Sequence, residues 1–266
     1  MAGDILSFIE EYVVEPFKYT TSDWLKILIG ASLLFISVII YVMLNFIGEI
    51  LIVLLGPFAI PFLFIMFCIY MVFEVIVDGY YIGVIRSTLK GLDTLPNWIN
   101  IGRILIDGVL YKVASIALMF LYLVVYFPLI LLLVIVKQLL QFISWRDWVL
   151  GLVLITVILF ITWSIYVPLA TVNFAKKGFL GFFDIWGILK KFSFEYLAIW
   201  VLYKIVPVII LLPIGICLDI LMLIPFVNIL VLLLVILLVV IIGPVLGFIL
   251  EVMFHRAVAK YYRERE

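Results

Sequence analysis

The stretch Val149–Phe174 reads VLGLVLITVILFITWSIYVPLATVNF and contains no charged side chain. A helix needs about 20 predominantly apolar residues to cross the hydrocarbon core of a bilayer. The run is continuous rather than alternating, which is not the pattern of a transmembrane β-barrel strand. The stretch therefore predicts a transmembrane α-helix, and the same pattern recurs along the chain.

Working outward from this stretch, the sequence predicts an all-α fold, a polytopic transmembrane helical bundle of six spans. A turn is expected around Gly48-Glu49, and the long apolar run that follows it is expected to break at Gly56-Pro57. Prolines inside other spans are tolerated where neighbouring helices satisfy the freed carbonyl groups. The six expected spans are Trp24–Ile47, Phe62–Ile85, Leu110–Val136, Val149–Phe174, Tyr196–Leu218 and Val227–Glu251.

The composition excludes a water-soluble domain. Hydrophobic residues make up 68% of the chain and charged residues only 13%, whereas a soluble domain has about 25% charged residues to cover its surface. We therefore expect residues 1–266 to form a single integral membrane domain. The formal net charge is zero, so the sequence gives no reason to expect nucleic acid as a partner.

The distribution of Lys and Arg predicts the orientation in the membrane. Of the 17 basic residues, all but Lys137 and Arg146 lie on one side of the expected spans, in connections and flanks, with Lys204 somewhat inside the fifth span. Basic residues are enriched on the cytoplasmic side of membrane proteins. We therefore expect a cell-membrane protein with cytoplasmic N- and C-termini, with Lys177 and Arg263 inside and Glu49 and Arg146 outside.

Both ends of the chain are expected to lie at the inner face. Residues 1–21 predict an N-terminal amphipathic helix that ends at Pro16 and packs on the protein or lies at the interface. Residues 252–266 predict a basic cytoplasmic tail.

Two inner connections resemble each other, which suggests degenerate repeats over residues 62–136 and 149–218; coincidence between two short linkers is the alternative. Within them, residues 97–107 and 182–191 predict amphipathic helices lying along the membrane surface. The expected interfacial contacts are Trp98, Arg103, Trp186 and Lys190. The first helix would carry one polar stripe, formed by Asn97, Asn100, Arg103 and Asp107.

Three ionisable residues, Glu74, Asp78 and Lys204, fall inside expected spans. A charge at the centre of a bilayer costs about 2.5 to 3.5 kcal/mol on insertion scales, so such residues face a protein interior or pair. We expect Glu74 and Asp78 to face the bundle interior, with one of them approaching Lys204. Either the three form a buried ion pair that locks two spans, or they form a proton or cation site.

Several short motifs resemble an archaeal membrane-protein family, domain of unknown function 4013. They are Phe17–Gly30, Gly79-Tyr-Tyr-Ile-Gly-Val-Ile-Arg86, Lys90-Gly-Leu-Asp-Thr-Leu-Pro-Asn-Trp98 and Ile106-Asp-Gly108. Asn97 stands where typical members carry an acidic residue. The resemblance implies an archaeal cell membrane and assigns no activity, cofactor or active-site residue.

The residues show no complete catalytic or cofactor signature. The chain has one histidine, His255, and no glycine-rich phosphate loop, so we expect no enzyme, no cofactor and no metal. The leading hypothesis is a non-enzymatic protein that binds membrane lipids or a partner, either another membrane protein or a second copy. The alternative is a small transporter or channel that uses Glu74 and Asp78 as a proton or cation site, and an intramembrane enzyme ranks third.

Overall fold

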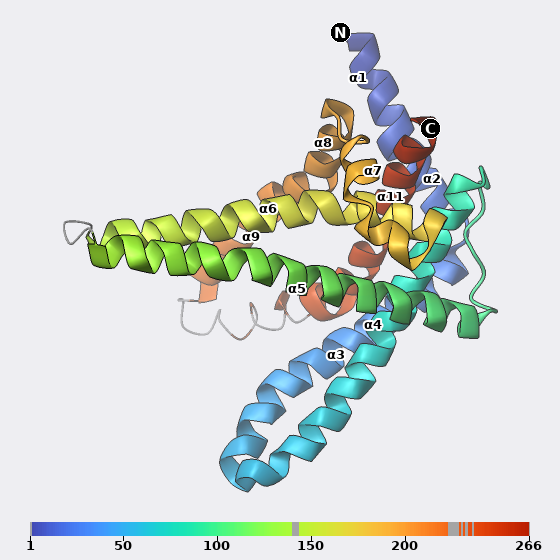
Figure 1. Cartoon of the computed structure of the whole chain (residues 1–266). Helices are drawn as coiled ribbons and strands as arrows, with labels where there is room; N and C mark the ends of the chain where they lie inside the picture. The colour runs from blue at the N-terminus through green and yellow to red at the C-terminus, as the bar shows by residue number, and fades with distance from the viewer. Residues whose placement is uncertain are drawn as a thin grey trace. The chain divides into compact units, whose positions relative to one another are not determined.

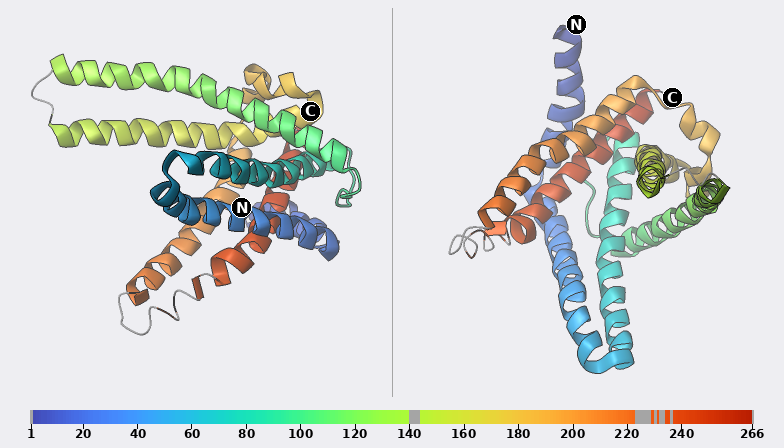
Figure 2. Two further views of the ribbon diagram at one scale, coloured as in Figure 1. Left: turned by 90° about the horizontal axis from the view of Figure 1, so that it is seen from below. Right: turned by 90° about the vertical axis from the view of Figure 1, so that its left-hand side faces the viewer.

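The computed structural model describes residues 2–139, 144–222, 229, 231, 234–235 and 237–265. All regular structure in these ranges is helical, which confirms the all-α prediction. The chain divides into two compact units (Figures 1 and 2), Met1–Val109 with Ser193–Glu266, and Leu110–Phe192. We call them unit 1 and unit 2.

Five stretches are long and apolar enough to cross a membrane. They are Trp24–Leu89, Ile101–Gln138, Trp148–Lys177, Phe194–Cys217 and Val240–Glu264. The first contains two of the six expected spans. The beginning of the expected span Val227–Glu251 falls largely outside the described residues, and the last apolar stretch extends further toward the C-terminus than predicted.

The stretch Trp24–Leu89 folds back on itself as a helical hairpin (Figure 1). Asp23 caps its first helix, α3 (Trp24–Leu55), by accepting a hydrogen bond from the backbone N–H of Lys26. A short 3₁₀ turn (Gly56–Phe58) leads into α4 (Ala59–Leu89). The turn needs glycine because Gly56 has a φ of 55°.

The turn expected at Gly48-Glu49 was therefore placed wrongly, because α3 continues through these residues to Leu55. A single glycine lowers helix stability by about 1 kcal/mol but does not end a helix. Gly48 instead allows close packing of the hairpin, since a β-carbon there would lie 3.3 Å from the Leu63 side chain.

The N-terminal segment is helical beyond the predicted end at Pro16. It comprises α1 (Ala2–Ile9), a π-helical turn (Glu10–Val14) and α2 (Glu15–Thr20). Pro16 directly follows the π-helical turn, and such turns accommodate a proline within a continuous helix. The segment is packed on the protein, because Tyr12, Tyr19 and Thr20 are buried in unit 1.

The predicted C-terminal tail is part of the core of unit 1. Helix α11 (Gly243–Glu264) contacts α2, α3, α4 and α8 (Phe194–Trp200). Its buried residues include Val252, Ala257, Val258 and Tyr261. Neighbouring helices cover several of its faces, so residues 252–262 are packed within unit 1. After α8, a π-helical segment (Val201–Ile205) continues into α9 (Val206–Met222).

Unit 2 is built on a second hairpin. Helix α5 (Ile101–Leu139) begins in unit 1 and continues into unit 2, where it pairs with α6 (Trp145–Lys177). Within the unit, the Tyr126 hydroxyl lies 3.0 Å from Thr156 Oγ1, and the Tyr122 and Trp163 rings meet edge to face. A 3₁₀ segment (Phe179–Phe183) and the short helix α7 (Ile185–Leu189) follow α6.

The two predicted surface helices differ from expectation. Residues 101–107 are not a separate helix but the first turns of α5, because no proline interrupts the chain before the span. In the second connection, residues 182–191 contain the end of a 3₁₀ segment and one five-residue helix. The likeness that suggested two repeats is therefore not matched by similar secondary structure in the linkers.

Candidate functional site

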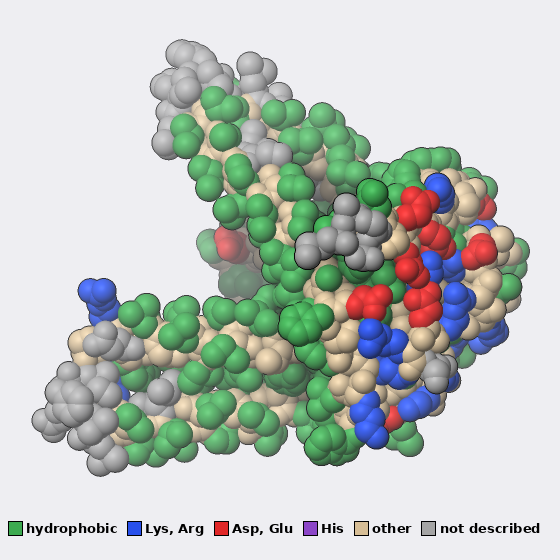
Figure 3. Space-filling model, turned by 90° about the horizontal axis from the view of Figure 1, so that it is seen from above, with side chains coloured by type: hydrophobic (Ala, Val, Ile, Leu, Met, Phe, Trp, Pro, Cys, Tyr) green, Lys and Arg blue, Asp and Glu red, His purple; other side chains and the backbone are tan. Residues whose placement is uncertain are grey.

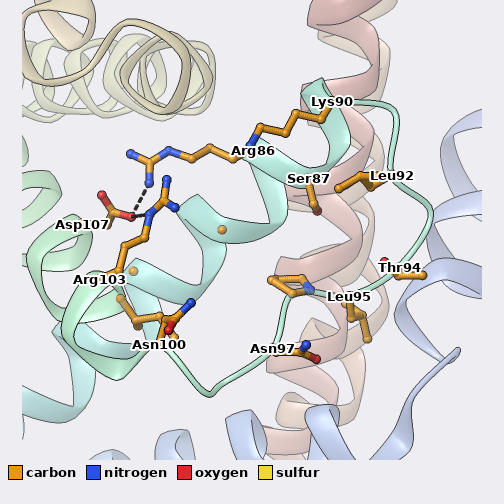
Figure 4. A pocket seen from close by; sticks show the side chains of 14 residues that line it. Arg86, Ser87, Lys90, Leu92, Thr94, Leu95, Asn97, Asn100, Arg103 and Asp107 are labelled. Atoms are coloured by element: carbon orange, nitrogen blue, oxygen red, sulfur yellow. Dashed lines mark hydrogen bonds and ion pairs between the residues drawn. The ribbon is translucent and has the colours of Figure 1, made fainter.

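A cavity of about 350 Å³ opens in unit 1 between the end of α4, the following loop and the start of α5 (Figure 4). Its lining carries an unusual share of polar side chains for a protein that is 68% hydrophobic. The lining includes the whole polar stripe predicted from the sequence. Its charged and amide-bearing residues are Arg86, Lys90, Asn97, Asn100, Arg103 and Asp107.

Two glycines bring α4 and α5 together beneath the cavity. A β-carbon on Gly79 would overlap the backbone oxygen of Ile104, and one on Gly108 would overlap that of Val75. The two backbones are thus in direct contact, as small residues permit between helices in lipid. This crossing fixes the distance between the cationic end of α4 and the two members of the polar stripe that lie on α5, Arg103 and Asp107.

The loop that closes the cavity is held by its apolar and aromatic residues. Leu95 is buried, and Lys26 donates a hydrogen bond to its carbonyl oxygen at 2.8 Å. Trp98 stacks on Tyr80 with ring centroids 3.9 Å apart, and its indole N–H donates to the backbone oxygen of Lys26. The loop is therefore anchored on one side, while Asn97 lines the cavity on the other.

Positive charge is in excess around the cavity. Arg86 donates a hydrogen bond to Asp107, and Arg103 Nε lies 3.9 Å from the same carboxylate. Asp107 is the one acidic residue among the lining side chains. The ammonium group of Lys90 is exposed and has no hydrogen-bond or ion-pair partner within the described part of the chain. The lining therefore carries two more positive charges than negative ones.

The intramembrane charges are arranged differently from the prediction. Lys204 donates to Glu251 at 2.6 Å, so the expected pairing with Glu74 or Asp78 was wrong. Glu74 accepts a hydrogen bond of 2.6 Å from the buried hydroxyl of Ser37 on α3. Glu74 is therefore bonded to α3, whereas Lys204 bonds the acidic residue contributed by α11.

The other predicted interfacial contacts divide between the two units. Trp98 belongs to the packing beneath the loop rather than to an open surface. In unit 2, Trp186 on α7 is 78% exposed, and Lys190 follows directly after that helix. Nearby, Lys177 bonds Asp184 at 2.7 Å, an interaction that lowers the pKa of the Asp184 carboxyl.

Sequence reasoning missed the structural role of Arg256, a buried charge that joins several segments of unit 1. It is 3% exposed and donates to Glu15, Asp93, Thr88 and the backbone oxygen of Leu92. These partners come from α2, α4 and the loop that closes the cavity. The sequence held one indication of this contact, namely that the N-terminal segment is acidic and the C-terminal segment is basic.

No group of three His, Cys, Asp or Glu side chains placed to hold a metal ion occurs in the residues that the structure describes. The two cysteines, Cys68 and Cys217, are free and exposed.

Comparison with known proteins gives a family and no activity. Residues 62–219 match the model of a family described as "Protein of unknown function (DUF4013)". The chain belongs to this family. The matched region of the DUF4013 chain contains the cavity, the glycine crossing and the whole of unit 2. The motif at residues 17–30, which also resembled the family, lies before the matched region.

Two relatives of this DUF4013 protein come from Methanocaldococcus jannaschii. The uncharacterized protein MJ1189 is 26% identical over 219 residues, which cover 75% of this chain and 72% of that protein. The uncharacterized protein MJ0233 is 28% identical over 222 residues, which cover 76% of this chain and 75% of that protein. No solved structure matches the chain.

Proposed function

We propose that the chain is a non-enzymatic, six-span protein of the cell membrane that binds an anionic membrane lipid in the cavity between α4 and α5. The observation that carries this proposal is the excess positive charge of the cavity, including an ammonium group on Lys90 without a partner among the described residues. Anionic lipid headgroups present phosphate oxygens, which Arg and Lys bind by charge-assisted hydrogen bonds.

The lengths of the helices support six spans. Helices α3 and α4 have 32 and 31 residues, which corresponds to roughly 46 Å each at 1.5 Å per residue. Each is longer than the roughly 30 Å hydrocarbon core. The stretch Trp24–Leu89 can therefore cross twice, and each of the other four apolar stretches can cross once.

The surface around the cavity supports a position at the inner headgroup layer. The loop side chain Ile99 is 83% exposed, and Ile101 at the start of α5 is 55% exposed. Apolar side chains beside cationic ones are typical of segments that sit at the boundary of headgroups and acyl chains. Figure 3 shows that the side chains along the long helices are mostly hydrophobic, as a surface in contact with lipid requires. The cytoplasmic side is the one that the distribution of Lys and Arg predicts for this loop.

Lipid binding is tested by titrating the purified full chain, in a neutral detergent, with phosphatidylglycerol and with phosphatidylcholine. We expect tight binding of the anionic lipid only. Each Lys or Arg near an anionic surface contributes about 1 kcal/mol, so Lys90→Ala combined with Arg103→Ala should weaken binding about 10- to 100-fold. Lys18→Ala is the matched control, because Lys18 is exposed on α2 and lies outside the cavity. Equal affinity of the double variant and the control would refute the proposal.

Transport is the second candidate function, and the position of Glu74 favours it. This carboxylate lies midway along the 31 residues of α4 and bonds Ser37 of the neighbouring helix. Carboxylates at such depth mark ion pathways in transporters. Proton or cation flux into liposomes that is abolished by Glu74→Gln would support this function over simple lipid binding. Unchanged flux in that variant would exclude Glu74 as the site.

A further inference from the structure

The cavity between α4 and α5 has two chemically different regions. Arg86, Arg103 and Asp107 cluster on one side (Figure 4). In Figure 4, Asn97 lies on the loop, away from the guanidinium groups, and Asn100 lies beside the base of Arg103, just before the first turn of α5. A ligand that fills the cavity would therefore meet the guanidinium groups on one side and the two carboxamides nearer the loop.

Both carboxamides are available to a ligand. Asn97 and Asn100 are exposed, and neither side chain has a hydrogen-bond partner within the described ranges. A carboxamide both donates and accepts hydrogen bonds, which is the same capacity that a hydroxyl group has. This end of the cavity is suited to a neutral group rich in hydroxyls.

The same cavity disfavours a ligand that carries an ammonium group. Its one acidic lining residue, Asp107, is already engaged by Arg86 and lies near Arg103. An ammonium group would lose water and meet a net positive charge, because no second carboxylate lines the site. Burying an unpaired charge costs free energy, so this repulsion weakens the binding of headgroups that carry an ammonium group.

We infer that the cavity selects a headgroup made of a phosphate diester and a polyol, as in phosphoglycerol or phosphoinositol lipids, over headgroups that carry an amine. The inference rests on the proposed function, since it names the lipid class for the same site. In this arrangement the phosphate contacts Arg103 and Lys90, and the hydroxyls contact Asn97 and Asn100.

The test compares lipids of equal net charge and different headgroup. The purified full chain in neutral detergent is titrated with phosphatidylglycerol, phosphatidylinositol and phosphatidylserine, and binding is measured by native mass spectrometry. Two hydrogen bonds to hydroxyls should favour the polyol lipids about 5- to 150-fold over phosphatidylserine. The same titration with soluble glycerol phosphate separates a lipid from a free phosphopolyol as the ligand.

Paired variants locate the selectivity. Asn97→Ala with Asn100→Ala should remove most of the preference for phosphatidylglycerol over phosphatidylserine while leaving phosphatidylserine affinity within about twofold. Asn45→Ala, an exposed asparagine on α3 outside the cavity, should leave the preference intact.

The outcomes distinguish the two proposals. Equal binding of all three lipids would overturn the headgroup inference and leave anionic-lipid binding standing. Binding of none would overturn both. Soluble glycerol phosphate that binds as tightly as phosphatidylglycerol would overturn lipid binding while upholding the phosphate-and-polyol chemistry.

Discussion

Replacing Arg256 with methionine should destabilise unit 1 more than neutralising either of its acidic partners, Glu15 or Asp93. The guanidinium group is 3% exposed and ties α11 to α2, α4 and the loop of the cavity. Methionine keeps much of the side-chain volume and removes every donor. Glu15 would then be left partly buried without its cationic partner.

The size of the effect follows from the exposure of each partner. Breaking a buried ion pair by removing one member costs about 3 to 5 kcal/mol. Glu15 is 32% exposed, whereas Asp93 is 83% exposed and its pair is worth little. We therefore expect a loss of about 3 kcal/mol for Arg256→Met, about 1 to 2 kcal/mol for Glu15→Gln, and less than about 0.5 kcal/mol for Asp93→Asn.

The assay is reversible unfolding of the purified chain in detergent, with the double variant Arg256→Met, Glu15→Gln completing a thermodynamic cycle. The double variant should be more stable than the sum of the two single losses predicts, by about 1 to 2 kcal/mol. A strictly additive cycle, or an Arg256→Met variant as stable as Asp93→Asn, would show that this network does not hold the helices together.

Three further predictions follow from the packing, the buried tyrosine and the orientation. Gly79→Ala should destabilise the chain by about 2 kcal/mol, because the added β-carbon would meet the backbone of α5. Gly102→Ala, at a site with open space around it, should be neutral or slightly stabilising. Equal melting temperatures of the two variants would refute the contact between α4 and α5. Burial and the hydrogen bond to Glu195 raise the pKa of Tyr12 in the folded protein. Its contribution to the free energy of unfolding is therefore fully present below pH about 10, the pKa of tyrosine in the unfolded chain, and is lost as the pH rises above that value. Melting curves should show a shallower alkaline decline in Tyr12→Phe, and an unchanged slope would contradict this. Cysteine substituted at Lys177 should react with an impermeant reagent only from the cytoplasmic side, and cysteine at Arg146 only from outside; the reverse pattern would invert the topology.

Local patterns predicted local structure well. Asn100, Arg103 and Asp107 follow one another at helical spacing, and the structure brings all three to one cavity wall. The Gly56-Pro57 break was also predictable, because proline cannot continue the hydrogen bonding of a helix and glycine accepts a positive φ. In contrast, Gly48 looked like a turn and instead serves packing against Leu63, a contact that no local pattern reveals.

Partners across helices could not be predicted. The depth of Lys204 along its span suggested Glu74 and Asp78 as partners, since all three lie at similar depth. The structure places α11 within reach, so Lys204 bonds Glu251 instead. Depth along a helix follows from sequence position, but which helices are neighbours follows from the packing of the whole unit.

The same limit explains the missed role of Arg256. Counting basic residues placed it in a cytoplasmic tail, because topology rules weigh charges by position along the chain. Its burial depends on α2, which precedes it by more than 230 residues and supplies Glu15. A charge becomes structural only when distant segments surround it.

The most direct test of the central claim is an experimental structure of the full chain in nanodiscs that contain phosphatidylglycerol. The account predicts density for a phosphate group in the cavity between α4 and α5, within hydrogen-bonding distance of Arg103 and Lys90, at the depth of the inner headgroups. A cavity filled by another part of the chain, or lying away from the headgroup layer with lipid bound elsewhere, would contradict it.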